Sequence, residues 1–178
     1  CSSALNAISL GARMLENGEA DYVIAGGSEA LSQFHLNGFN TLMILDHERC
    51  RPFDATRAGL NLGEGAAFLV MTRSDSARYA YVTGWGNRCD AYHQTATSDD
   101  GLGARLCMQD ALDMAGLKPS DIPYVNAHAT GTPNNDRSES KAIYGVFADA
   151  MPLVSGTKSL TGHTTSASGA IEAVLCLM

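Results

Sequence analysis

The sequence lacks several features that would assign it to a specialised class of protein. It contains no apolar run close to the roughly 20 residues of a membrane-spanning helix, and its first residues do not resemble a signal peptide. Its five cysteines are scattered without a CxxC pair, which argues against a zinc site and against a disulfide framework. We therefore expect a soluble, cytoplasmic protein that holds no metal and makes no membrane contact.

Patterns for binding nucleic acids and nucleotides are also scarce. Twelve Lys and Arg stand against 19 Asp and Glu, the formal net charge is -7, and the chain has no run of basic residues. Because phosphate binding depends on clustered basic side chains, we expect no nucleic-acid partner. The glycines at 26–27 and 63–65 do not open a helix in a G-x-G-x-x-G pattern, which argues against nucleotide binding.

What is present suits a globular α/β protein. The 178 residues are 45% hydrophobic and include 18 glycines, so the chain can bury a sizeable core between many tight turns. Periodic apolar positions predict helices at residues 1–15, 104–115 and 136–150, and from residue 166 onward. Short apolar runs predict strands at residues 22–25, 66–72, 79–83, 123–127 and 153–155. This alternation predicts a parallel sheet packed between helices.

Two details of this assignment bear on function. The first helix would hold Cys1 in its first turn, and Gly26-Gly27 would end the first strand. A helix that begins at the first residue and another that runs to the last are poor natural domain boundaries. We therefore expect the chain to be a piece of a longer protein, truncated at both ends.

Three residues could carry chemistry. A cysteine at a helix N-terminus meets unpaired backbone N–H groups, which favour its thiolate, so Cys1 is a candidate nucleophile. His128 follows a predicted strand and opens a loop rich in hydroxyls, and His163 also lies beyond a predicted strand. Each of these residues, taken alone, favours a structural role over a catalytic one. A nucleophile together with two imidazoles favours covalent catalysis.

Five segments resemble the landmarks of one enzyme family, in the same order. The segments CSSAL at 1–5, HATGTP at 128–133 and KSLTGH at 158–163 resemble the active-site motifs of the β-ketoacyl synthases. RPFD at 51–54 and GEGA at 63–66 resemble two further landmarks. The resemblance implies an α/β, thiolase-like fold with α-β-α-β-α layers, of which this chain would hold a part. Residues 1–84 would end the N-terminal half, and residues 85–178 would begin the C-terminal half.

The resemblance also implies a reaction, the decarboxylative condensation of an acyl thioester with malonyl-acyl carrier protein in fatty-acid or polyketide-like synthesis. Cys1 would carry the acyl group, and His128 and His163 would donate hydrogen bonds to the developing enolate. Lys158 would place a positive charge beside the imidazoles, supported by a buried network that includes Asp136 and Glu139. The remaining implied site residues, which would bind the phosphopantetheine arm, are Thr130 and Thr132. This acyltransferase chemistry requires no metal and no diffusible cofactor.

The acyl carrier protein is the implied partner, and the full-length family members form homodimers or ketoacyl synthase heterodimers. The second histidine favours the elongating class, because initiating synthases use asparagine and thiolases a second cysteine. Two alternatives stay open: an inactive fragment or non-catalytic partner subunit, and a thiolase-like enzyme that uses coenzyme A. Acyl chain length and pathway are not determined by these motifs.

Overall fold

The structure is a computed structural model that describes residues 1–74 and 79–178. The chain divides into two compact units. The first, here the Cys1 unit, comprises Cys1–Gly38, Leu62–Val82 and Thr161–Met178, and the second, the His128 unit, comprises Phe39–Asn61 and Thr83–Leu160. Among the described residues, no helix has the length and apolar character needed to cross a membrane.

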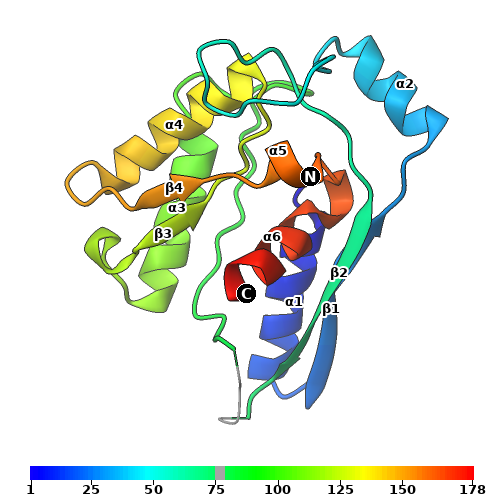
Figure 1. Ribbon diagram of the computed structural model, residues 1–178. Helices are drawn as coiled ribbons and strands as arrows, with labels where there is room; N and C mark the ends of the chain where they lie inside the picture. The colour runs from blue at the N-terminus through cyan, green and yellow to red at the C-terminus, as the bar shows by residue number, and fades with distance from the viewer. Residues whose placement is uncertain (75–78) are drawn as a thin grey trace. The chain divides into compact units, whose positions relative to one another are not determined.

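The Cys1 unit is built on one antiparallel strand pair, formed by β1 (Tyr22–Glu29) and β2 (Gly65–Thr72). Two helices, α1 (Ser3–Glu16) and α6 (Ser168–Leu177), cover one face of this pair, as Figure 1 shows. The core on that face is made of small and branched side chains, among them Ala4, Ile8, Ala25 and Ala170. The short helix η2 (Thr165–Ala167) leads directly into α6.

Gly26 and Gly27 lie inside β1 and do not end it, contrary to the prediction. Both have ordinary strand backbone, and they are needed because neighbouring backbone comes very close. A Cβ on Gly26 would lie 2.0 Å from the carbonyl oxygen of Ala67, and one on Gly27 would lie 3.1 Å from that of Ser166. These glycines therefore allow β1 to continue to Glu29 beside the η2 turn.

The His128 unit contains a parallel strand pair, β3 (Tyr124–Asn126) and β4 (Leu153–Ser155). Helices α3 (Leu102–Ala115) and α4 (Pro133–Phe147) pack against each other, and the 3-10 turn η1 (Pro119–Asp121) precedes β3 (Figure 1). The core of this unit is a cluster of buried apolar residues: Leu112, Ala127, Ala129, Ile143 and Phe147. The remaining helices are α2 (Gln33–Thr41) and α5 (Lys158–Thr161).

Most predicted elements are present, with three corrections. The prediction of a parallel sheet is wrong for β1 and β2, which pair antiparallel. Helix α2 was not predicted; its sequence QFHLNGFNT is polar and contains glycine, and none of its residues is buried. The predicted strand at 79–83 is also wrong. Its tyrosines Tyr79 and Tyr81 are exposed, and the chain beyond it lies against α3, where a Cβ on Gly84 would meet the carbonyl oxygen of Ala111.

Candidate active site

Cys1 lies just ahead of the first helix of the Cys1 unit. The backbone carbonyl of Ser2 accepts the first helical hydrogen bond, from the N–H of Asn6, so α1 begins at Ser3. Cys1 is therefore two residues before the helix, where the prediction placed it in the first turn. Its exposed thiol lies with Sγ 3.1 Å from Nε2 of His163. A cysteine in contact with an imidazole is the basic element of thiol nucleophiles.

His163 is almost fully buried, at 1% exposure, and its position is fixed by its own backbone. Its carbonyl accepts a hydrogen bond of 3.1 Å from the N–H of Gly63. The preceding Gly162 has a φ of 68°, and a Cβ there would lie 2.9 Å from the backbone of Gly63. Only glycine suits such a turn at such a close approach. The turn at Gly162 thus places the His163 ring in contact with Cys1 within this unit.

The hydrogen bonds of His163 determine which ring nitrogen carries the proton. Its Nδ1 accepts from the backbone N–H of Thr165 at 3.3 Å and lies 3.0 Å from the hydroxyl of Ser168. A backbone N–H can only donate, so Nδ1 must be the unprotonated nitrogen of the neutral ring. The proton of neutral His163 is therefore on Nε2, where it faces the sulfur of Cys1.

His128 reaches the same state in the His128 unit by another route. It lies just past the carboxyl end of β3, and the ammonium of Lys158 lies 3.3 Å from its Nδ1 and donates to its carbonyl at 2.5 Å. An ammonium has no acceptor capacity, so Nδ1 of His128 is also the accepting nitrogen and Nε2 carries the proton. Lys158 itself is 1% exposed. It supplies a buried positive charge that opposes protonation of the ring.

Glu139 extends from α4 to the backbone of the same loop. Its two carboxylate oxygens accept hydrogen bonds from the N–H groups of His128, at 2.6 Å, and Ala129, at 2.9 Å. Burial raises the pKa of this carboxyl, while those two hydrogen bonds and the charge of Lys158 act in the opposite direction. The direct contacts of Glu139 therefore hold the His128 backbone, with Lys158 acting on it through its charge.

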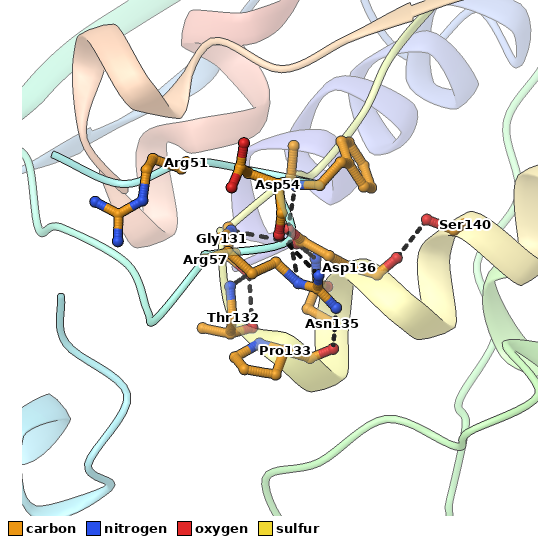
Figure 2. Close-up of polar contacts among 12 residues, drawn as sticks. Arg51, Asp54, Arg57, Gly131, Thr132, Pro133, Asn135, Asp136 and Ser140 are labelled. Atoms are coloured by element: carbon orange, nitrogen blue, oxygen red, sulfur yellow. Dashed lines mark hydrogen bonds and ion pairs between the residues drawn. The ribbon is translucent and has the colours of Figure 1, made fainter.

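Asp136 connects three segments of the His128 unit, as Figure 2 shows. One oxygen accepts from the backbone N–H of Gly131 at 3.2 Å, and the other accepts from that of Phe53 at 2.7 Å. Arg57 adds a charge with its Nε at 3.7 Å from the second oxygen. Asp136 is 1% exposed, so these partners compensate a buried carboxylate. The acid thereby joins the RPFD segment to the loop that follows His128.

Thr130 and Thr132 are both buried and lie with their hydroxyl oxygens 2.9 Å apart. The glycine between them has a φ of 81°, and a Cβ there would lie 2.6 Å from the carbonyl oxygen of Gly59. Glycine at 131 therefore keeps the two threonine hydroxyls on the same side of a tight loop. Their predicted contact with a pantetheine arm stays a prediction.

Comparison with known protein families agrees with these motifs. Residues 1–77 match the family described as Beta-ketoacyl synthase, N-terminal domain, and residues 79–178 match Beta-ketoacyl synthase, C-terminal domain. The chain belongs to the β-ketoacyl synthase family. The division proposed from the sequence, between residues 84 and 85, stays a prediction.

Individual β-ketoacyl synthases are similar over the whole of this chain. The 3-oxoacyl-[acyl-carrier-protein] synthase 2 of Staphylococcus aureus is 40% identical over 98% of the chain and 47% of its own length. The ketosynthase of Xenorhabdus doucetiae, solved with its chain length factor, superposes with a TM-score of 0.94 at 41% identity, covering 99% of this chain and 43% of its own. A ketosynthase bound to a hexaketide, solved with its type II polyketide acyl-carrier protein, gives a TM-score of 0.94 at 31% identity, covering 99% and 47%.

These similarities confirm the predicted α/β, thiolase-like fold. They also confirm that the motifs identify a β-ketoacyl synthase sequence. The chain spans about half the length of the curated relatives it matches.

The sequence named Cys1, His128, Lys158 and His163 as candidate site residues but did not reveal the residues that hold His163 in place. Ser168, at 2% exposure, lies against the ring, and Glu29 binds the turn that contains Thr165. The polar run TTSAS after His163 was a usable signal, since five small residues with four hydroxyls are unusual ahead of an apolar helix. Nothing in the spacing of the sequence connects Glu29 with Thr165.

Proposed function

We propose that this chain carries the catalytic residues of a β-ketoacyl-acyl carrier protein synthase of the elongating type. The observation that supports this most is the contact of Cys1 with a buried histidine whose Nδ1 is already occupied by a permanent donor. This geometry offers the sulfur an N–H donor, which favours the thiolate over the thiol. The similarity to named 3-oxoacyl-[acyl-carrier-protein] synthases supports the same reaction.

The first step is transfer of an acyl group to Cys1. The thiolate attacks the carbonyl carbon of the acyl thioester, and the tetrahedral intermediate collapses with expulsion of the carrier thiol. An acyl-Cys1 thioester remains. The proton that the carrier thiolate gains is the one that Cys1 gave up, so the step is balanced.

The second step is decarboxylation of a malonyl thioester. Carbon dioxide leaves, and its bonding electrons form an enolate whose oxygen carries the developing charge. We assign the stabilisation of this oxygen to the Nε2–H groups of His128 and His163, since each ring is held with that nitrogen protonated. Lys158 keeps His128 neutral, and Glu139 and Asp136 hold the loop that carries it.

In the third step the enolate carbon attacks the acyl-Cys1 carbonyl. A carbon–carbon bond forms, the bond to Cys1 sulfur breaks, and the product is a β-ketoacyl thioester with a free Cys1 thiolate. Every atom and electron pair comes from the two thioesters, so the proposed chemistry requires no metal and no diffusible cofactor. We assign to Thr130 and Thr132 the binding of the phosphopantetheine arm that carries each thioester.

The partners proposed for this reaction are an acyl carrier protein and a second ketosynthase-type subunit. The support comes from relatives: one ketosynthase was solved with an acyl-carrier protein and another with a chain length factor. The presence of Cys1 favours the catalytic subunit over a non-catalytic partner. A cytoplasmic location, where carrier proteins would supply the substrate, is part of the same proposal.

The test is covalent labelling of Cys1 in the purified protein. Incubation with an acyl-carrier thioester, or with cerulenin, should add the corresponding mass to the peptide that contains Cys1. The Cys89→Ala variant, which alters another exposed cysteine, is the matched control and should label normally. An unreactive Cys1 in a folded protein would favour the non-catalytic alternative, whereas turnover of acetoacetyl-coenzyme A without malonyl-carrier protein would favour the thiolase-like one.

A further inference from the structure

Glu29, the last residue of β1, accepts several hydrogen bonds from a turn that is distant in the sequence. One carboxylate oxygen accepts from the hydroxyl of Thr165, from the hydroxyl of Ser166 at 2.6 Å, and from the backbone N–H of Ser166 at 3.3 Å. The other oxygen lies 3.4 Å from Nδ1 of His35. The carboxylate thus binds both residues of one dipeptide within the Cys1 unit.

The dipeptide that Glu29 binds has a conformation that needs support. Thr165 has a φ of 36°, a left-handed backbone that is unfavourable for a β-branched residue. Strained positions of this kind persist only where the surroundings hold them in place. The hydroxyl of Ser166 also lies 3.2 Å from the carbonyl of Ser28, next to Glu29 in β1. The end of β1 is therefore what holds the turn in this conformation.

The same turn presents the group that fixes His163. Because Thr165 adopts the left-handed conformation two residues after His163, its N–H points back to Nδ1 of the ring. This N–H is an obligate donor, so it is what keeps the proton on Nε2 and directed at Cys1. Glu29 thus acts on Cys1 indirectly: it binds the Thr165-Ser166 turn, the turn donates to the His163 ring, and the ring contacts the Cys1 sulfur.

A charged acceptor suits this position better than a neutral one. Hydrogen bonds to an ionised carboxylate are stronger than neutral ones, and a single oxygen here receives three donors. Those donors lower the pKa of Glu29 from its ordinary 4.5 to about 2, so the charge is present at neutral pH. A glutamine in its place would keep the shape of the side chain but lose the charge.

We propose that Glu29 is a positioning residue for His163, holding the Thr165-Ser166 turn so that the imidazole keeps its proton on Nε2. Its catalytic consequence rests on the function proposed above, while its effect on the ring does not. The carboxylate defines the tautomer from the end of β1, and the hydroxyl of Ser168 adds a second contact on Nδ1.

The test is the Glu29→Gln variant, examined by ¹⁵N NMR of histidine-labelled protein at neutral pH. The resonances of His163 are those lost in His163→Ala. In the wild type we expect one tautomer, with Nδ1 unprotonated, and in Glu29→Gln a mixture of both tautomers. Thr165→Val, which removes one of the donors with little change in volume, should shift the ring in the same direction and serves if Glu29→Gln does not fold.

The matched control is Glu19→Gln, which removes the same charge from an exposed residue whose carboxylate accepts from Asn17. It should leave the His163 resonances and the activity unchanged. In Glu29→Gln, kcat for malonyl decarboxylation should fall by about 10- to 100-fold, because part of the His163 population no longer carries its proton on Nε2. KM should be nearly unchanged, because Glu29 does not contribute to substrate binding. If folded Glu29→Gln and folded Thr165→Val both kept the wild-type His163 resonances, the proposal would be overturned.

A wild-type protein without decarboxylase activity would instead count against the proposed function, and the NMR comparison would still decide the role of Glu29.

Discussion

The two histidines of this chain are fixed in the same tautomer by different kinds of donor. In the Cys1 unit the donors on Nδ1 of His163 are neutral, a backbone N–H and a hydroxyl. In the His128 unit the donor on Nδ1 of His128 is the ammonium of Lys158. A neutral donor selects the tautomer alone, whereas a cation also opposes protonation of the ring.

The difference corresponds to what each ring faces. His163 lies against the Cys1 sulfur, which is negative as a thiolate and neutral once acylated, so its surroundings change charge during the proposed cycle. His128 lies beside a permanent positive charge that does not change. We infer that His128 is the constant N–H donor of the pair, and that the state of His163 depends on the state of Cys1.

The largest effect that can test this comparison is removal of either ring. His128→Ala and His163→Ala should each lower malonyl decarboxylation by about 10²- to 10³-fold, since each removes one donor to the enolate oxygen. Acyl transfer to Cys1 should survive in His128→Ala and should fall less than decarboxylation in His163→Ala, whose ring also donates to the sulfur, as measured by the mass of the acyl adduct. His47→Ala, at an exposed position, is the control. Equal loss of both steps in His163→Ala would contradict this division of roles.

The sequence alone named candidate site residues, whose catalytic roles stay predictions, but it did not indicate how those residues are held. Cys1, His128, Lys158 and His163 were identified because short motifs encode them as contiguous letters. The residues that hold His163 are far apart in the sequence. Glu29 accepts hydrogen bonds from Thr165 and Ser166, and the left-handed backbone of Thr165 exists only in the folded chain. Long-range hydrogen bonds of this kind leave no periodicity in a single sequence.

The fold shows the same limit. Helices α3 and α4 were predicted because each combines an apolar periodicity with a clear end or beginning. The antiparallel pairing of β1 with β2 was not predicted, because an apolar run indicates a buried strand without naming its partner or direction. Gly26 and Gly27 were assigned as a strand end for a similar reason, since a glycine required by close backbone and a glycine required by a turn look identical in sequence.

A smaller effect should separate the two kinds of donor. Lys158→Met keeps a similar volume but removes the ammonium that contacts Nδ1 of His128, so both tautomers of the His128 ring should appear in the ¹⁵N spectrum. Decarboxylation should fall by about 10- to 100-fold. The protein should also lose about 1–3 kcal/mol of unfolding free energy in urea, because the half-buried carbonyl of His128 loses its donor.

The counterpart in the Cys1 unit is Ser168→Ala, which should cost less than about tenfold in decarboxylation because the Thr165 N–H remains on Nδ1. Lys118→Met, at an exposed position, is the control for the loss of a cation. Equal losses in Lys158→Met and Ser168→Ala would show that the charge of Lys158 adds nothing to its role as a donor.

The smallest effect concerns the pH dependence of stability. Two carboxylates, Glu29 and Glu139, hold the segments next to the histidines, and their pKa values are shifted in opposite directions. The pKa of Glu29 is lowered to about 2, so its contribution to stability is present above its unfolded value of 4.5 and is lost as pH falls toward 2. The pKa of Glu139 is raised by burial, so its contribution to stability is fully present below 4.5 and is lost as pH rises through its folded value.

The measurement is the urea midpoint of unfolding from about pH 3 to about pH 8. The wild type should lose its stability advantage over Glu29→Gln at the acid end, and its advantage over Glu139→Gln at the alkaline end. If both advantages changed with pH in the same direction, the two carboxylates would not be held by the opposed environments described here, a neutral hydroxyl-rich turn for Glu29 and a desolvated loop for Glu139.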